Sequence, residues 1–212
     1  MSFSAKRYTE PSAGGFIQTK TAYSDMSAAE REEIKYTLTV ALNRMRKGID
    51  VNLIPYDGCF MVYAMSHARG SEDVAGIQGS IVQEGTGAES ATVIAYNADN
   101  FLTLTVLTVM KFYPHMRSAA CFWCSEKIVE TIEEMMFDIR YAKKVDSSSV
   151  ISLLDFEVAS FCSIGDVPDI IINTGEGKKE RILRLLGENP DEVVTSLIKI
   201  AARINNTTIE DR

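Results

Sequence analysis

Apolar side chains recur every three or four residues along two long stretches of the chain, which is the period of a helix with one buried face. In the first stretch these positions are Ile34, Leu38, Ala41, Leu42 and Met45. A capping box, Ser27 and Glu30, precedes them, and Gly48 follows as a stop. In the second stretch they are Ile128, Ile132, Met135, Met136 and Ile139. The pattern therefore predicts helices over residues 27–47 and 118–143.

Between these stretches the pattern changes to short apolar segments, at residues 51–54, 60–65, 77–82 and 92–96. Proline and glycine residues separate or interrupt the segments, and Asp57-Gly58 matches a two-residue hairpin turn. Parallel strands need long crossover connections, which this spacing does not provide. We therefore expect a mainly antiparallel sheet over about residues 50–97.

The C-terminal third predicts one strand and two helices. Residues 168–173 form an apolar run, and a helix over residues 178–186 is expected to end at Gly187. The last helix has Asn189 as its N-cap and Pro190 at its first position. Its expected core face consists of Val193, Val194, Leu197, Ile200, Ala201 and Ile204.

Two segments are ambiguous. Residues 101–113 alternate like a strand, whereas their length favours a helix, and residues 150–162 match neither pattern. The remaining elements predict a single α+β domain over residues 25–205, followed by a polar tail at 206–212. In this domain the antiparallel sheet packs against helices 27–47 and 118–143, and the C-terminal strand and two helices close the remaining face.

Residues 1–24 are rich in serine, threonine, glycine and proline, which predicts an extended N-terminal arm rather than a helix. The arm nevertheless carries five large apolar side chains, Phe3, Tyr8, Phe16, Ile17 and Tyr23. Because burial of such side chains is favourable, we expect them to dock on the domain or on a neighbouring subunit. This predicts a homo-oligomer with these five residues at the interface.

Charge and hydropathy restrict the class of protein. The formal net charge is −7, and an acidic surface repels phosphate backbones, so broad nucleic-acid binding is not expected. The N-terminus lacks the apolar segment of a signal peptide, and the longest apolar stretch is too short to span a bilayer. We therefore expect a cytoplasmic protein without membrane insertion, whose four cysteines are reduced.

The sharpest chemical motif is the pair Cys121 and Cys124, in the sequence Cys-Phe-Trp-Cys. Such a pair at a helix N-terminus supports disulfide exchange. Both sulfurs also continue the apolar stripe of the predicted helix 118–143, which favours two buried, reduced thiols. The other cysteines and the histidines are too scattered to complete a zinc site, so we expect no metal and no cofactor.

A glycine-rich turn at residues 174–178 is the second motif. Between a strand and a helix, Gly175, Gly177 and Lys178 would be candidate ligands for a phosphorylated compound, since amides at a helix N-terminus bind anions. The turn is shorter than a complete P-loop, and Glu176 would repel phosphate, so a plain turn is favoured.

The chain has only two histidines, His67 and His115, which argues against hydrolytic or zinc chemistry. His67, close to Arg69, Glu72 and Asp73, suits an exposed loop residue better than a general base. By elimination, these features favour a non-enzymatic, self-associating structural or interaction protein, of the kind found in viral or phage assemblies. The alternatives are a small enzyme or regulatory module that binds a phosphorylated ligand at 175–178, and a thiol redox protein.

Overall fold

The computed structural model describes residues 14–48, 60–78, 82–84, 87–89, 93–98, 101–143, 156–174 and 181–210. Its centre is a seven-stranded sheet made of β1 (Met61–Ala64), β2 (Val74–Gln78), β5 (Val93–Tyr96), β6 (Ser118–Cys124), β7 (Ile139–Lys143), β8 (Ile170–Thr174) and β9 (Arg181–Gly187). In space the strands are ordered β5-β2-β1-β6-β9-β8-β7. β7 and β8 pair in parallel, and the other neighbours in the sheet are antiparallel. β3 (Val82–Glu84) and β4 (Gly87–Glu89) form a separate antiparallel pair.

The longest ladder lies at the middle of the sheet. β6 and β9 are paired over seven residues each, from Ser118 opposite Gly187 to Cys124 opposite Arg181. Both strands have neighbours on both edges, and β9 from Leu183 to Gly187 is buried. Because both faces of this strand are covered, Leu183, Leu185 and Leu186 are all buried, and so is the charged residue Arg184 between them.

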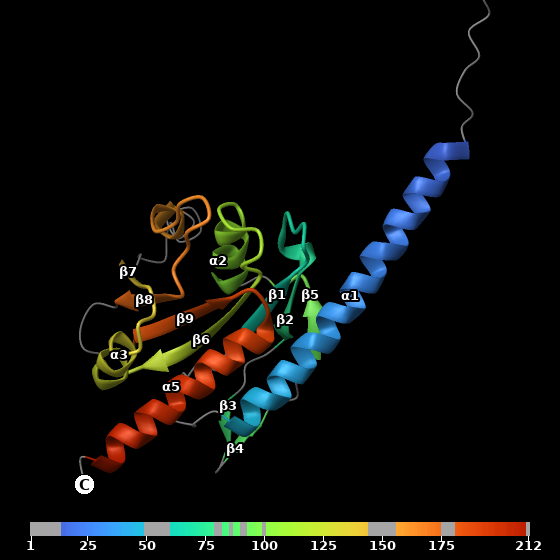
Figure 1. Cartoon of the computed structure of the whole chain (residues 1–212). Helices are drawn as coiled ribbons and strands as arrows, with labels where there is room; N and C mark the ends of the chain where they lie inside the picture. The colour runs from blue at the N-terminus through green and yellow to red at the C-terminus, as the bar shows by residue number, and fades with distance from the viewer. Residues whose placement is uncertain are drawn as a thin grey trace, which may run out of the picture.

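Helices cover both faces of the sheet (Figure 1). They are α1 (Gly14–Gly48), α2 (Phe101–Met110), α3 (Glu126–Glu133) and α5 (Pro190–Glu210), with a further short helical turn at residues 156–160. One core cluster joins the sheet to α1, α3 and α5, and includes Leu38, Ile132 and Leu197. The other joins the opposite face to α2 and to Val158 of the short turn. The domain therefore has three layers.

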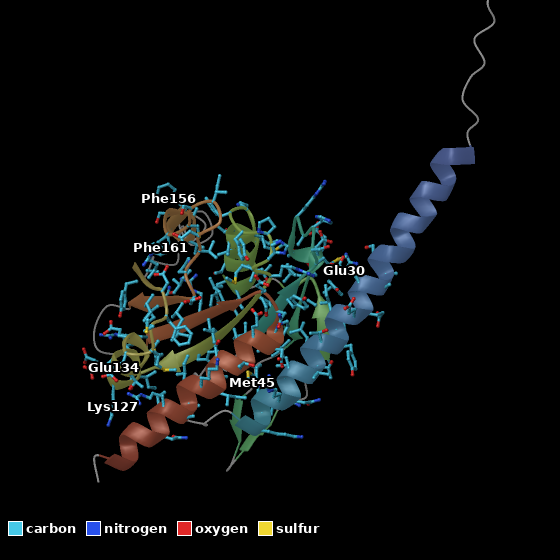
Figure 2. All side chains as sticks on the ribbon, in the orientation of Figure 1. Glu30, Met45, Lys127, Glu134, Phe156 and Phe161 are labelled. Atoms are coloured by element: carbon cyan, nitrogen blue, oxygen red, sulfur yellow. The ribbon has the colours of Figure 1, made fainter. Side chains whose placement is uncertain are left out.

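α1 is far longer than the face it covers. Its C-terminal half packs beside α5, where Met45 is fully buried (Figures 1 and 2), whereas its N-terminal half extends away from the rest of the domain. The apolar stripe that predicted helix 27–47 is buried at all five positions. The helix does not begin at Ser27, however, so the predicted capping box is wrong.

The predicted arm also needs correction. Residues 14–24 belong to α1 rather than to an extended segment, and residues 1–13 lie outside the described part of the chain. A helix that continues unbroken from a well-packed segment needs no new nucleus, which explains how α1 extends through residues of modest helix propensity. Likewise α5 continues to Glu210, into the predicted polar tail 206–212.

The predicted helix over 118–143 is wrong. The structure has a strand, a short helix and another strand there, namely β6, α3 and β7. Ser125 provides the true N-cap, since its hydroxyl accepts a hydrogen bond from the amide of Ile128 at 3.3 Å. Met136, expected in the buried stripe, is 95% exposed and adopts a left-handed φ of 61° in the turn after α3.

The predicted helix over 178–186 is wrong as well, because residues from 181 form strand β9, antiparallel to β8. Other predictions are confirmed. The strand near 168–173 is β8, the ambiguous segment 101–113 contains the helix α2, and α5 begins at Pro190. The strand signals at 60–65, 77–82 and 92–96 correspond in part to β1, β2, β3 and β5, whereas residues 51–54 and 57–58 lie outside the described residues.

None of the helices in the described part of the chain combines the length and the apolar character needed to cross a membrane.

Candidate functional site

An open pocket of about 510 Å³ lies between the loop that follows β1 and the C-terminal end of α2. Its volume is in the range of small-molecule binding sites. The residues that line it are Ser66, His67, Ala68, Arg69, Leu107, Met110, Lys111 and Pro114.

The pocket combines two chemical surfaces. Arg69 and Lys111 are exposed cations, and His67 adds an exposed imidazole to the same pocket lining. Leu107 and Met110 supply apolar wall from α2. In a chain with a net charge of −7, this grouping of basic side chains favours a ligand that has an anionic group and an apolar body.

Leu107 and Met110 line the pocket from α2, a helix that also contains several β-branched threonines. The hydroxyl of Thr105 donates to the carbonyl of Phe101, one turn earlier, at 2.9 Å. The hydroxyl of Thr103 likewise bonds to the carbonyl of Ala98. Satisfied in this way, the threonine side chains are buried within a helix, although their alternation in the sequence resembles a strand.

The loop at the pocket begins at a polar cluster on the α1 face of the sheet. A carboxylate oxygen of Glu30 accepts a hydrogen bond of 2.7 Å from the amide of Ser66 and another of 3.2 Å from Arg117. Arg117 also donates to the carbonyl of Ala64 at 3.0 Å and lies 4.8 Å above the ring of Tyr63. With exposed fractions of 20% and 27%, the Arg117–Glu30 pair is better shielded than an ordinary surface ion pair.

The other end of the loop is held by the next residue of α1. Arg31 donates to the carbonyl of Glu72 and to the carboxylate of Asp73, each at 3.0 Å. The second oxygen of that carboxylate accepts from the amide of Arg69 at 3.1 Å. Two consecutive residues of α1, through Ser66 and Asp73, thereby position the segment that carries His67 and Arg69.

Tyr96 of β5 supports this arrangement. The Arg31 guanidinium lies 4.3 Å above its ring, and its hydroxyl donates to the carbonyl of Arg31 at 3.2 Å. Burial raises the pKa of Tyr96 to about 12, although the charge of Arg31 acts in the opposite direction. The phenol therefore stays protonated and remains a donor over the physiological range of pH.

A second polar centre lies inside the α2 layer. Arg184 of β9 is fully buried and donates to Thr105 of α2 at 2.9 Å and to Asn173 of β8 at 2.5 Å. Burial lowers its pKa to about 10, and the charge of Glu157 opposes that shift. Arg184 therefore connects the sheet to α2, and it is not among the residues that line the pocket.

The structure separates the two thiols of the motif singled out in the sequence. Cys121 and Cys124 are both buried on β6, but Cys121 belongs to the core under α2 and Cys124 to the core under α1 and α5. Residues three apart on a strand point to opposite faces and lie about 10 Å apart, beyond disulfide reach. Burial raises the pKa of Cys124 to about 12. This arrangement does not suit thiol exchange.

The remaining predicted site residues are distributed as follows. Gly175, Gly177 and Lys178 lie outside the described residues, but the helix that was expected to follow them is the strand β9, so the reason for an anion site there is lost. Phe3 and Tyr8 are also outside the described residues. Phe16, Ile17 and Tyr23 belong to α1, and self-association stays a prediction.

The basic pocket residues were only partly visible in the sequence. His67 was predicted to be an exposed loop residue, and Arg69 lies two residues after it in the same loop. Lys111 follows a distant helix, and no local pattern connects it to them. His115 packs its ring edgewise on Tyr113, with 5.7 Å between ring centres, outside the pocket. No three metal-ligating side chains are grouped among the residues that the structure describes.

Comparison with known proteins adds to this geometry. A family model described as thiamine-phosphate synthase ThiN matches residues 37–199. The chain is 24% identical over 206 residues to the bifunctional thiamine biosynthesis protein ThiDN of Methanocaldococcus jannaschii. The match covers 96% of this chain and 49% of that protein, so the chain spans about half the length of this relative.

Two solved structures share the fold. The C-terminal domain of protein MJ0236 superposes with a TM-score of 0.73 at 24% identity, and the match covers 84% of this chain and 97% of that domain. The C-terminal domain of a phosphomethylpyrimidine kinase gives a TM-score of 0.70 at 28% identity, over 81% of this chain and 100% of that domain. In both cases the similarity covers the whole of a C-terminal domain.

Proposed function

The chain belongs to the thiamine-phosphate synthase ThiN family, and on this premise we propose that it acts in the formation of thiamine phosphate and holds the phosphate group in the pocket at His67, Arg69 and Lys111. The family model covers about three quarters of the chain, including every residue that lines this pocket. The interpretation as a non-enzymatic structural protein, with its viral or phage setting, is therefore wrong. That interpretation rested on the absence of local catalytic motifs. Such an argument cannot detect a site whose residues lie far apart in the sequence.

The observation that carries the proposal is the composition of the pocket. Thiamine phosphate has a phosphate group at one end and flat heterocyclic rings at the other. Arg69, Lys111 and the imidazole of His67 offer hydrogen-bond donors to phosphate oxygens, and charge-assisted bonds of this kind are the strong ones. The side chains of Leu107 and Met110 offer apolar surface to a ring.

The composition of the pocket predicts selectivity for a phosphorylated compound over the free vitamin. Unphosphorylated thiamine carries a positive charge and leaves the basic side chains without an anion. We therefore expect the protein to bind thiamine phosphate more tightly than thiamine by at least about tenfold, the value of a single hydrogen bond to a charged group.

Calorimetry with thiamine phosphate and thiamine tests the binding. Arg69→Ala and Lys111→Ala are each expected to weaken binding of thiamine phosphate by about tenfold or more, with much smaller effects on thiamine. Lys127→Ala is the matched control, because Lys127 is an exposed lysine on α3, away from the pocket (Figure 2). Full affinity in both pocket variants would place the ligand elsewhere, and absence of binding in the unmodified protein would reject the proposal.

Mass spectrometry tests the reaction itself, with a pyrimidine methyl diphosphate and the phosphate ester of the thiazole alcohol as substrates. The thiazole nitrogen forms the new bond to the pyrimidine methylene carbon, diphosphate leaves, and both thiamine phosphate and diphosphate are measured. Product formation that is lost in Lys111→Ala and kept in Lys127→Ala supports a catalytic protein. Tight binding of thiamine phosphate without product formation would retain the binding site and reject the synthetic role.

A further inference from the structure

We propose that Glu30 and Arg31 of α1 are positioning residues for the pocket, and that through them ligand binding and the packing of α1 against the sheet depend on each other. The proposal rests on the proposed function, since it assumes that a phosphorylated ligand occupies the pocket. Neither residue lines the pocket. Both act on the loop between Ser66 and Asp73, which carries His67 and Arg69.

Glu30 holds the first residue of the pocket wall. Its side chain is directed from α1 towards the sheet (Figure 2), where it accepts from the amide of Ser66 at 2.7 Å. The same oxygen accepts from Arg117, whose position is fixed by Ala64 and by the ring of Tyr63. The carboxylate therefore links α1 to the point where β1 ends and the loop begins.

Arg31 holds Arg69, the last residue of the loop that lines the pocket, through the carboxylate of Asp73. One carboxylate oxygen of Asp73 accepts from Arg31 at 3.0 Å, and the other accepts from the amide of Arg69 at 3.1 Å. The Arg31 guanidinium is itself oriented by Tyr96, over whose ring it lies at 4.3 Å. Movement of Arg31 would therefore be passed to Arg69 through a single carboxylate.

The loop also has restraints of its own. The amide of Asp73 donates to the carbonyl of Gly70 at 3.1 Å, and the hydroxyl of Ser71 donates to the side-chain oxygen of Asn97 at 2.9 Å. The amide of Ala68 donates to the carbonyl of Met65 at 3.2 Å, and the amide of Met65 donates to the carbonyl of Asp73 at 3.0 Å. His67 and Arg69 are exposed, so core packing does not hold them. Binding groups on a loop are effective only when surrounding contacts hold them in place, and here α1 supplies three hydrogen bonds, to Ser66, Glu72 and Asp73.

Linkage makes this relationship reciprocal. If the bonds from α1 raise the affinity of the pocket, a bound ligand must stabilise the same bonds by the same factor. The N-terminal half of α1 extends away from the domain (Figure 1). A ligand in the pocket would thus bias the docking of a helix that reaches well beyond it.

The test uses the full chain and two substitutions, Glu30→Gln and Arg31→Gln. Each has a matched control on the same helix: Glu32→Gln, whose side chain pairs with Lys35 on the exposed face, and Arg44→Gln, whose side chain pairs with Asp191 of α5. The readout is the ratio of the dissociation constants for thiamine and thiamine phosphate. Partial unfolding weakens both ligands equally and leaves the ratio unchanged, whereas displacement of the basic side chains lowers it.

We expect the ratio to fall at least about fivefold in Glu30→Gln and in Arg31→Gln, and to stay unchanged in both controls. Hydrogen exchange should also show that thiamine phosphate slows exchange of α1 amides around residues 30–35 in the unmodified protein but not in the two variants. Unchanged ratios, or ligand-independent exchange in α1, would overturn this proposal. If the unmodified protein binds thiamine phosphate and Lys111→Ala abolishes that binding, such a result leaves the proposed function intact.

Discussion

The guanidinium of Arg184 donates a hydrogen bond of 2.9 Å to the hydroxyl of Thr105, and this contact joins the central strand β9 to the helix α2. Its other arm reaches Asn173 of β8 at 2.5 Å. The side chain is fully buried, and burial lowers its pKa to about 10 against the opposing charge of Glu157. Among the described residues, the buried Nε of Arg184 has no hydrogen-bond partner. The two terminal nitrogens therefore make the hydrogen bonds that offset burial of the charge, and both are expected to matter for stability.

Arg184→Lys should destabilise the protein by about 2–4 kcal/mol, because an ammonium group cannot reach Thr105 and Asn173 in the same geometry and leaves buried acceptors unsatisfied. Urea unfolding measures this. Arg181→Lys is the control: Arg181 is partly exposed at the start of β9, 3.6 Å from Glu126, and its replacement should change stability by no more than about 0.5 kcal/mol. Equal unfolding midpoints for the two variants would show that the forked geometry is unimportant.

The thiols of Cys121 and Cys124 should react slowly with alkylating reagents in the folded protein and should not form a disulfide with each other. They lie on opposite faces of β6, and burial raises the pKa of Cys124 to about 12. Cys162 is half-buried, with its pKa raised by burial to about 11, and should react before them. Peptide mapping after brief native alkylation checks the order, and a Cys121–Cys124 disulfide would contradict the geometry.

Stability should fall in alkaline solution because of Cys124. The unfolded thiol ionises near its ordinary value of 9, whereas the folded thiol keeps its proton up to about pH 12. Above pH 9, the pKa of the unfolded thiol, the unfolded state binds fewer protons than the folded state. The free energy of unfolding therefore decreases as pH rises. Between about pH 8 and about pH 10 the loss should be larger in the unmodified protein than in Cys124→Ala by about 1 kcal/mol. Parallel urea curves at the two pH values give this difference, which should vanish if the thiol is solvated.

Gly76→Ala should destabilise the sheet by about 1–3 kcal/mol through overpacking. A Cβ atom at Gly76 would lie 2.7 Å from that of Ala98 and 3.1 Å from a methyl group of Val62, both on backbone fixed by strand pairing or burial. Gly48→Ala is the comparison, because its new Cβ would meet only the flexible side chain of Ile198 at 3.0 Å. Thermal unfolding should separate the two variants, and similar melting temperatures would contradict this account.

The sequence was sufficient to predict a helix where it contains a capping residue or a regular spacing of apolar residues. The carboxamide of Asn189 accepts from the amide of Glu192 at 3.0 Å, as the N-cap pattern predicted. The predicted core positions of α5 that are buried are Val193, Val194, Leu197, Ile200 and Ala201. The stripe of α1 was identified for the same reason. Each of these features depends on neighbours within one or two turns, which the sequence displays directly.

Only the tertiary structure identified the strands that are buried on both faces, because their sequences do not alternate between apolar and polar residues. β6 contains the consecutive buried residues Ser118, Ala119 and Ala120, and such a run is compatible with helix and strand alike. The partners of Arg184 could not be predicted either, since nothing in the sequence around it indicates that it will contact Thr105 and Asn173. The basic pocket is also of this kind, because Arg69 and Lys111 converge only when β1 and α2 pack together. The sequence by itself determined the buried faces of α1 and α5 and the residue at which α5 begins. Long-range strand pairing determined which charges came together, because that pairing is set by contacts between residues far apart in the chain.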